Sequence, residues 1–251
     1  MMETCLIVGA SSGLGRSLTY EAARRGYNLI LISSDQSDLQ AIASDVRIRF
    51  GKKVDVIEFD FTSAGHSVSS FVERLMSEHS QVSRVLIPLG AAYKNDFILG
   101  DWSVMLQTFA VNFFAPTFIA KEFLKNYKAL NLKTIVLVSS ISSQFPRVEN
   151  AFYSAAKAAL DSVSKSLRIQ ADMSERAVNV IVVRLGYLES QYTFGRRLPF
   201  PVATPQEVAC KIFKNIDRWN GQVTVPRFWL FVLFLIGHLP WGIYSRMGRV
   251  K

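Results

Sequence analysis

A tyrosine and a lysine stand four positions apart in an alanine-rich stretch, as Tyr153-Ser-Ala-Ala-Lys157. In a helix, side chains at this spacing project from the same face, one turn from each other. The ordinary pKa of a tyrosine hydroxyl is about 10, and a nearby ammonium lowers this pKa because it favours the phenolate. The pair therefore predicts a proton donor for a carbonyl oxygen that receives a hydride.

A glycine-rich loop directly follows an apolar run that ends at Val8. Gly9 allows a tight turn, and Gly13 lets a pyrophosphate approach a helix N-terminus, where free N–H groups and the helix dipole favour anions. Gly15 lets that helix pack close to the sheet. Because the loop follows a strand and opens a helix, it predicts dinucleotide binding. The loop residues that we expect at the cofactor are Gly9, Ser11, Ser12, Gly13, Leu14 and Gly15.

Two serines, Ser139 and Ser140, close another apolar run, and Ser140 stands thirteen residues before Tyr153. In a doubly wound sheet the carboxyl ends of the strands face the ligand crevice. The glycine loop and Ser140 should therefore meet at one edge of the sheet. We interpret Ser140 as a catalytic hydroxyl rather than as an ordinary loop residue.

Short apolar runs alternate with longer helical patterns along most of the chain. Strands apolar on both faces are typical of a buried parallel sheet covered by helices. The alternation predicts an α/β fold, with a single doubly wound, Rossmann-like parallel sheet and helices on both faces. The expected strands are 4–8, 28–32, 54–59, 85–88, 134–139, 179–184 and 222–225, and the expected helices are 14–25, 37–50, 67–80, 102–128, 150–173 and 205–219.

The bulk properties of the 251 residues fit one such domain, which we place at residues 1–226. The formal charge of +9 attracts phosphates, anionic lipid or nucleic acid, but no basic run with interleaved aromatics indicates nucleic-acid binding. The two cysteines and three histidines show no metal spacing, so we expect no metal and free thiols in a reducing compartment. The first strand leaves no room for a signal peptide, which predicts a cytoplasmic protein.

The C-terminal extension, residues 227–251, departs from the alternating pattern. Residues 228–236 are continuously apolar and aromatic-rich, Pro240 follows, and the cations Arg227, Arg246, Arg249 and Lys251 flank the run. Three interpretations stay open: a buried core element, an interfacial membrane contact, or a membrane span. The run is short and interrupted for a span, and the flanking cations favour contact with a membrane surface.

With these motifs in place, the chain resembles the short-chain dehydrogenase/reductase family from Thr4 to about Val225. The matching motifs are the glycine loop, Asp60-Phe61-Thr62 after the third expected strand, Asn112, Ser140, and the Tyr153/Lys157 pair. The resemblance implies that Tyr153 is the general acid/base, while Lys157 lowers its pKa and holds the nicotinamide ribose. It also implies that Ser140 polarises the substrate carbonyl and that Asn112 holds a water linking Lys157 to solvent.

The resemblance further implies cofactor contacts from Asp60 and Phe61 near the adenine ring. Two motifs depart from the family pattern. After the fourth strand the usual Asn-Asn-Ala-Gly is replaced by Pro88-Leu-Gly90-Ala, and after the sixth the usual Pro-Gly is replaced by Leu185-Gly186. Small residues remain at both places. We therefore still expect Gly90, Gly186 and Leu188 at the cofactor, with Ser190 where the family commonly has threonine.

The end of the second expected strand bears on the choice between the two nicotinamide cofactors. An acid near Ser33 would bind the ribose 2′-hydroxyl of NAD, and none stands there. Ser33 and Ser34 can instead donate to a 2′-phosphate, with Arg16 as a cationic neighbour, although Asp35 stands only one or two positions later. We expect NADP rather than NAD.

The favoured function is a cytoplasmic carbonyl reductase working at the cytoplasmic face of a membrane. The extension resembles that of short-chain reductases acting on polyprenyl-phosphate-linked sugars or other lipids, and Arg196-Arg197 would then meet a substrate phosphate or remain a solvated pair. One alternative is a soluble reductase of small ketones or 3-oxoacyl thioesters, and another is a non-catalytic dinucleotide sensor. By resemblance, we expect a homodimer or homotetramer that uses the helices containing Asn112 and Tyr153, and no nucleic-acid partner.

Overall fold

The computed structural model describes residues 3–62, 67–93, 95–175, 178–191, 193–195 and 198–248. The predicted substrate contacts Arg196 and Arg197, and the terminal cations Arg249 and Lys251, lie outside the described residues.

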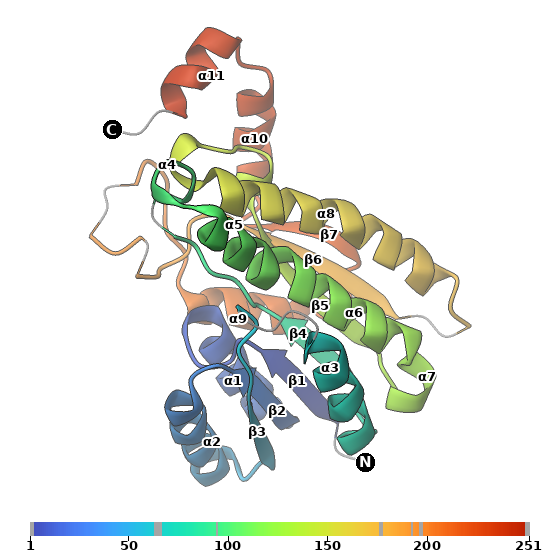
Figure 1. Cartoon of the computed structure of the whole chain (residues 1–251). Helices are drawn as coiled ribbons and strands as arrows, with labels where there is room; N and C mark the ends of the chain where they lie inside the picture. Colours follow the sequence, from blue (N-terminus) through green and yellow to red (C-terminus); the bar gives the residue numbers. More distant parts are fainter. Residues whose placement is uncertain are drawn as a thin grey trace.

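Seven parallel strands form one sheet in the order β3-β2-β1-β4-β5-β6-β7 (Figure 1). The chain builds outward from β1 to β3 and then starts again at β4 on the other side of β1, so the strand order reverses between β1 and β4. The predicted doubly wound parallel sheet is confirmed. The strands are β1 (Thr4–Val8), β2 (Asn28–Ser33), β3 (Val54–Glu58), β4 (Arg84–Ile87), β5 (Thr134–Ser140), β6 (Asn179–Leu185) and β7 (Gly221–Val225).

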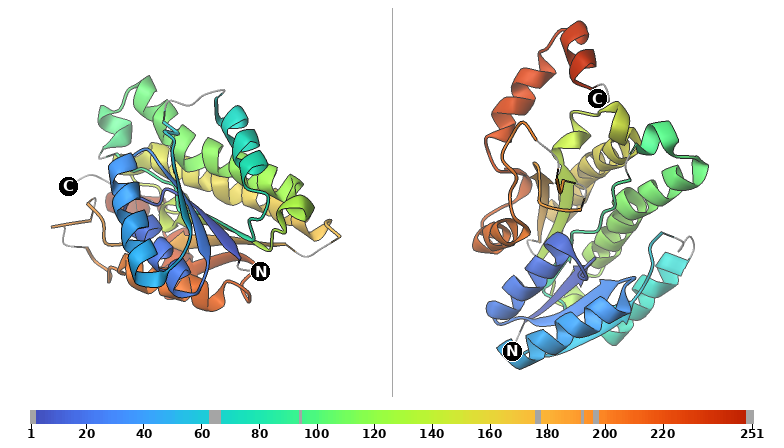
Figure 2. Two further views of the ribbon diagram at one scale, coloured as in Figure 1. Left: turned by 90° about the horizontal axis from the view of Figure 1, so that it is seen from below. Right: turned by 90° about the vertical axis from the view of Figure 1, so that its left-hand side faces the viewer.

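Helices cover both faces of this sheet (Figure 2). Alternate residues of each strand point to opposite faces, so Leu6 and Val8 pack with one set of helices while Cys5 and Ile7 pack with the other. One layer holds α1 (Gly13–Arg24), α2 (Gln36–Phe50) and α9 (Pro205–Asn215), and the other holds α3 (Ser67–Glu78), α5 (Trp102–Phe109), α6 (Ala115–Lys125) and α8 (Ala151–Asp172). Shorter elements are α4 (Asp96–Leu99), α7 (Tyr127–Leu130), and the 3₁₀ turns η2 (Ile141–Ser143) and η3 (Val148–Asn150).

The helix predicted over residues 102–128 is not continuous. A π-helical segment, η1 (Ala110–Phe114), separates α5 from α6, and α7 follows α6. Single turns of π-helix are frequent at functional sites because they change the direction of side chains within a helix. Asn112 lies in this segment.

The stretch Trp102–Lys125 is long and apolar enough to cross a membrane by length and composition alone, with a mean hydropathy of 1.4. Its inward residues Val111, Ile119 and Phe123 belong to the core between the sheet and α8. Packing in the domain therefore accounts for part of its apolar character, since 39% of the apolar window is buried.

The C-terminal extension forms two short helices, α10 (Trp229–Gly237) and α11 (Trp241–Met247), which stand beyond one end of the sheet (Figures 1 and 2). Neither approaches the roughly 20 residues that a membrane-spanning helix needs. Trp229 and Ile236 are buried against the domain, whereas Phe231 and Phe234 are 66% and 61% exposed. The extension thus has one face in the core and one apolar face open to the surroundings.

Candidate active site

The Lys157 side chain is the most deeply buried charge among the predicted catalytic residues, with 2% of the residue exposed. It runs from α8 to the carboxyl ends of two strands, where its Nζ donates to the main-chain oxygens of Val138 (3.0 Å) and Leu89 (3.4 Å). Burial lowers the pKa of Lys157 to about 8, and the carboxylate of Asp161, one helical turn further on, opposes this shift.

Tyr153 lies in the first turn of α8, and the Nζ of Lys157 is 5.8 Å from the centroid of its ring. The position of this turn is set by Asp96 of α4, whose carboxylate oxygens accept from the main-chain N–H groups of Phe152 (3.2 Å) and Tyr153 (2.8 Å). Asp96 is buried, and desolvation raises its pKa although the main-chain N–H groups act in the other direction. The sequence analysis missed this residue, because α4 was not predicted.

Asn112 approaches Lys157 from the π-helical segment. Its Nδ2 donates to the main-chain oxygens of Ala91 (2.7 Å) and Thr108 (2.9 Å), while its buried Oδ1 accepts no hydrogen bond from the described residues. A Cβ built on Gly90 would lie 3.1 Å from this Oδ1 and 3.3 Å from the Nζ of Lys157. The glycine at position 90 therefore leaves the space in which the amide and the ammonium converge.

Ser140 is the last residue of β5, and its Oγ accepts from the main-chain N–H of Ser142 at 3.1 Å. Because this bond uses the oxygen as an acceptor, the hydroxyl hydrogen stays available as a donor. The turn η2 that follows Ser140 packs against α8, the helix that carries Tyr153 and Lys157. The strand end and the helix thus bring the three predicted catalytic residues to one region.

The glycine loop has the geometry that an anion site requires. Gly9 and Gly13 adopt positive φ angles of 92° and 49°, which favour glycine. A Cβ on Gly15 would overlap the main-chain oxygen of Gly9, so the first turn of α1 packs directly on the loop. Ser12 begins α1 without a side-chain hydrogen bond to the helix, which leaves the first N–H groups of α1, including those of Gly13 and Leu14, for a ligand.

At the end of β2, the Ser33 hydroxyl forms a 2.7 Å hydrogen bond with that of Ser11, and Ser34 is exposed. Asp35 caps α2 by accepting from the main-chain N–H of Asp38 at 2.9 Å, so its carboxylate is already engaged. This hydrogen bond also lowers the pKa of Asp35.

Arg16 lies on the other side of this strand end, in the first turns of α1. Its guanidinium donates to the main-chain oxygen of Ser11 and pairs with Asp38, both at 2.9 Å. A cation therefore stands close to the end of β2, partly neutralised by a carboxylate from α2.

The side chains of Asp60 and Phe61, which were predicted to lie near the adenine ring, contact neighbouring residues of the protein. The Asp60 carboxylate accepts from the main-chain N–H and the hydroxyl of Thr62, at 2.8 Å each. The Phe61 ring is buried in the core, in contact with the rings of Phe59 and Phe71. Of Phe61, only the main chain can meet a ligand at this edge.

Gly186 and Leu188 follow β6. A Cβ on Gly186 would overlap the indole nitrogen of Trp229. Close packing against α10 is therefore sufficient to explain a glycine at this position, without a cofactor contact. The main chain of Leu188 is bridged to Ala203, and its oxygen accepts from the Thr193 hydroxyl at 2.8 Å.

A cleft of about 310 Å³ opens between the glycine loop and the segment after β6. It is lined by Gly13, Arg16, Ser17, Glu189, Ser190, Gln191, Phe194, Pro205 and Gln206. Its lining comes from the first turns of α1, the segment after β6 and the start of α9, and it includes none of Ser140, Tyr153 and Lys157.

A reversed strand order of this kind, with a glycine loop between β1 and α1, defines the Rossmann class of dinucleotide-binding folds. The sequence matches the short chain dehydrogenase family over residues 3–197. The chain therefore belongs to the short-chain dehydrogenase family and is an oxidoreductase that interconverts carbonyl and alcohol groups.

Individual relatives agree with this assignment. The chain is 25% identical over 257 residues to a very-long-chain 3-oxoacyl-CoA reductase of Vanderwaltozyma polyspora, with 97% of this chain and 73% of the relative covered. It is 26% identical over 265 residues to an 11-beta-hydroxysteroid dehydrogenase of Pinus massoniana, with 95% and 72% covered. A solved structure of a 7beta-hydroxysteroid dehydrogenase has the same fold, with a TM-score of 0.82 at 18% identity over 98% of this chain and 96% of the other.

The lowered pKa of Lys157 predicts a measurable dependence of stability on pH. Below about pH 8 the lysine is protonated in both the folded and the unfolded protein, so folding carries the full cost of removing the ammonium from water. As the pH rises from about 8 toward 10.5, the folded state releases the proton first, and this cost declines. Relative to the Lys157→Met variant, the unchanged protein should therefore gain about 2 kcal/mol of unfolding free energy between about pH 7 and pH 9.5.

Urea unfolding of both proteins at the two pH values measures this difference. Subtracting the unfolding free energy of the variant from that of the unchanged protein at each pH cancels the contribution of hydrogen bonds whose strength does not change with pH. The exposed Lys121, replaced by Met, is the matched control and should show no such change. A difference between wild type and Lys157→Met that is the same at both pH values would show that Lys157 is not desolvated as described.

Proposed function

We propose that the protein is an NADP(H)-dependent reductase of a hydrophobic carbonyl compound and that Tyr153, Lys157, Ser140 and Asn112 carry the reaction. The observation that carries this proposal is the buried Lys157 ammonium at the ends of β4 and β5, with the Tyr153 ring one helical turn away. The two relatives support a hydrophobic substrate, because their names specify a very-long-chain 3-oxoacyl-CoA and a hydroxysteroid.

In this proposal, the glycine loop, Ser33, Gly90 and the residues after β6 would hold a nicotinamide dinucleotide, which would supply the hydride. Tyr153 donates its hydroxyl proton to the carbonyl oxygen, and the free hydrogen of Ser140 Oγ donates a hydrogen bond to the same oxygen. The Lys157 ammonium stabilises the phenolate that remains on Tyr153. The Oδ1 of Asn112 and the Nζ of Lys157 converge at Gly90, where a water held between them returns a proton from solvent.

The roles of Tyr153 and Lys157 can be separated by substitution. Tyr153→Phe removes only the proton donor, so NADPH reduction of a ketone should fall by about 10²–10⁴-fold while the Kd for NADPH changes by no more than a few-fold. Lys157→Ala should damage both rate and affinity, because Lys157 also holds the ribose. Stopped-flow hydride transfer and cofactor fluorescence measure the two quantities. A Tyr153→Phe variant that keeps more than about a tenth of the rate would mean that another group is the acid.

The preference for NADP over NAD rests on the end of β2. Asp35 is engaged as the cap of α2 and Asp38 pairs with Arg16, whereas Ser34 is exposed and Arg16 lines the cleft. These groups suit a ribose 2′-phosphate, since a hydrogen bond to a charged group contributes about 1.5–3 kcal/mol. The ion pair with Asp38 holds Arg16 in place and reduces its charge at the same time.

We therefore expect kcat/KM for NADPH to exceed that for NADH by about 10- to 100-fold. Arg16→Ala should lower the value for NADPH about tenfold with little effect on NADH, and Asp38→Asn should raise it, because Arg16 is then unpaired. Arg24→Ala, at the opposite end of the same helix, is the control. A clear preference of the unchanged protein for NADH would overturn this part of the proposal.

We place the reaction at the cytoplasmic face of a membrane because of an apolar rim around one end of the sheet. The rim consists of the exposed apolar residues Phe97, Ile98, Leu99, Trp102, Leu230, Phe231, Phe234, Leu235, Trp241, Ile243 and Met247. Its parts are joined, since the Tyr244 ring of α11 packs 5.2 Å from that of Phe145 and α4 packs against η3. Surface patches of this kind mark sites of interaction.

The sequence composition of the C-terminal extension favours an anionic lipid surface as the partner of the rim. Residues 227–251 contain Arg227, Arg246, Arg249 and Lys251 but no acidic residue. Each such cation gains about 1 kcal/mol near an anionic leaflet, and exposed aromatic side chains prefer the headgroup level. A hydrophobic substrate dissolved in or anchored to the membrane would then enter beside α4 and α10.

Vesicle binding tests this placement with two exposed side chains that leave the buried Trp229 intact. We expect the protein to co-sediment with vesicles containing phosphatidylserine, and the Phe231→Ser/Phe234→Ser variant to bind at least about tenfold more weakly, because burying each ring contributes about 1.5–3 kcal/mol. The variant should reduce a water-soluble ketone at the normal rate.

The matched control is Ile48→Ser/Met173→Ser, which removes two exposed apolar side chains at 84% and 80% exposure from α2 and the end of α8. If the unchanged protein ignores the vesicles, the rim is not a membrane contact and the soluble reductase of small ketones or 3-oxoacyl thioesters replaces this proposal. If NADPH binds but no ketone is reduced, the non-catalytic dinucleotide sensor replaces this proposal.

A further inference from the structure

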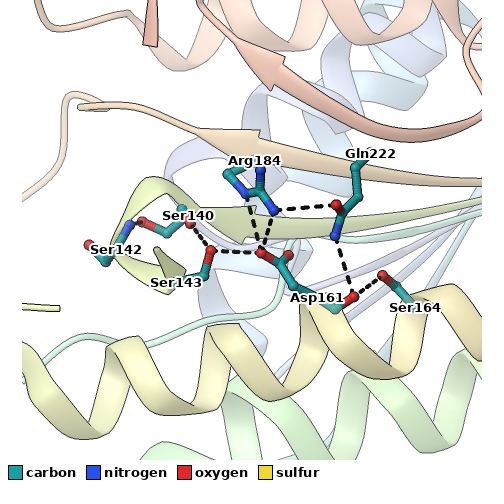
Figure 3. A network of polar contacts seen from close by, with 7 residues as sticks. All are labelled: Ser140, Ser142, Ser143, Asp161, Ser164, Arg184 and Gln222. Carbon is teal, nitrogen blue, oxygen red and sulfur yellow. Dashed lines mark hydrogen bonds and ion pairs between the residues drawn. The ribbon is translucent and has the colours of Figure 1, made fainter. Parts of the chain in front are cut away.

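A buried polar network lies directly behind Ser140, between α8, β6 and the turn η2 (Figure 3). Its centre is an ion pair, in which the guanidinium of Arg184 donates to Oδ2 of Asp161 from both Nε (3.2 Å) and NH2 (2.8 Å). The two side chains are only 8% and 10% exposed. Arg184 belongs to β6 and Asp161 to α8, so the pair joins the sheet to the catalytic helix.

Ser143 connects this ion pair to Ser140. Its Oγ lies 2.6 Å from Oδ2 of Asp161 and 2.7 Å from the main-chain oxygen of Ser140. A hydroxyl carries one hydrogen and can donate fully to only one of these acceptors, and the carboxylate is the stronger acceptor. The last residue of η2 is therefore tied to Asp161 on α8.

The orientation of the Ser140 hydroxyl depends on the same turn. Its Oγ accepts from the main-chain N–H of Ser142, which is the middle residue of η2. The turn thus has two attachments, one at Ser143 to Asp161 and one at Ser142 to Ser140. If the first is released, the N–H that orients Ser140 is no longer held in place.

Asp161 also reaches the catalytic lysine, since it stands four residues after Lys157 on the same helix. Its carboxylate is one of the two influences on the Lys157 ammonium, opposite in direction to burial. The remaining polar contacts of Asp161 go to its main-chain oxygen, which accepts from Ser164 Oγ (2.7 Å) and Gln222 Nε2 (3.3 Å). These bind the helix backbone and do not touch the turn.

We propose that Ser143, Asp161 and Arg184 form a positioning unit that holds η2 so that the hydroxyl hydrogen of Ser140 points at the substrate oxygen. This inference rests on the proposed role of Ser140 and goes beyond it, because none of the three residues touches substrate or cofactor. Arg184 fixes the carboxylate of Asp161, Asp161 fixes the Ser143 hydroxyl, and Ser143 fixes the turn.

The test uses Ser143→Ala in the full chain, which removes one partly exposed hydroxyl and leaves the ion pair intact. Hydrogen–deuterium exchange of the peptide containing Ser142 reports on the turn without any turnover. Kinetics with NADPH and either a 3-oxoacyl-CoA or a steroid ketone report on the reaction. We expect exchange in this peptide to become at least about tenfold faster and kcat to fall about 10- to 100-fold, the effect of a small misplacement of a catalytic group, with KM and the Kd for NADPH nearly unchanged.

Two further variants separate positioning from general stability. Ser143→Thr keeps the hydroxyl and should restore both slow exchange and normal kcat. Ser164→Ala removes a buried hydroxyl whose hydrogen bond within the described residues goes to the Asp161 main chain, and should change neither. In Asp161→Asn/Arg184→Gln, which avoids an unpaired buried charge, kcat should fall as in Ser143→Ala and the pH profile of kcat should shift toward lower pH, because Lys157 loses its neighbouring carboxylate.

The inference is overturned if Ser143→Ala exchanges as the unchanged protein does, or if its turn exchanges faster while kcat stays the same. If the unchanged protein reduces neither ketone, the proposed function fails; the exchange measurement then decides by itself whether Ser143 holds the turn.

Discussion

An ammonium group that is almost completely removed from water needs hydrogen-bond acceptors that point into the protein. Parallel strands supply such acceptors where one strand ends before its neighbour. The pairing of β4 with β5 stops at Ile87 and Leu137, and the main-chain oxygens of Leu89 and Val138 lie just beyond it. Lys157 uses this property of β4 and β5, and its position dictates what surrounds it. Gly90 leaves room beside the ammonium, Asn112 lies in the π-helical segment, and α8 carries the lysine to the strand ends.

Positive and negative charges alternate among the neighbouring buried side chains of this region. The Asp161 carboxylate opposes the effect of desolvation on Lys157, and the Arg184 guanidinium in turn pairs with Oδ2 of that carboxylate, while its buried Oδ1 accepts no hydrogen bond from the described residues. Buried ion pairs of this kind contribute little to net stability, because desolvation of both groups offsets their attraction. Their retention beside the proposed catalytic residues is explained better by geometry, since they tie a strand, a helix and a turn together at fixed angles.

Much of the fold could be predicted from the sequence because strong local patterns agree with the tertiary structure. All seven strands lie where apolar runs indicated, and the glycine loop connects β1 to α1 as expected. The π-helical break at Asn112 did have a mark in the sequence, which the continuous helix predicted over residues 102–128 passed over. Pro116 lacks the N–H that would donate to the main-chain oxygen of Asn112, four residues earlier, and a proline disturbs a helix at this point. No element was predicted at α4, which is only four residues long.

The residues that position the candidate site were harder to find than those proposed to react. Tyr153, Lys157 and Ser140 have types and spacings that indicate chemistry. Asp96, by contrast, is one acid in a loop-like stretch, and its function as an acceptor for two main-chain N–H groups depends on contacts 56 and 57 residues away in sequence. Arg184 does carry a signal in retrospect, since a charged residue within an otherwise apolar buried strand requires a partner.

The small helix α4 contributes both to the candidate active site and to the exposed apolar rim. Its first residue, Asp96, determines where the backbone of Tyr153 lies, and the following residues Phe97, Ile98 and Leu99 are part of the exposed apolar rim. Four consecutive residues thus belong both to the exposed apolar rim and to the support of the turn that carries the proposed proton donor. Substitutions made there to probe surface binding are therefore also substitutions in the support of Tyr153.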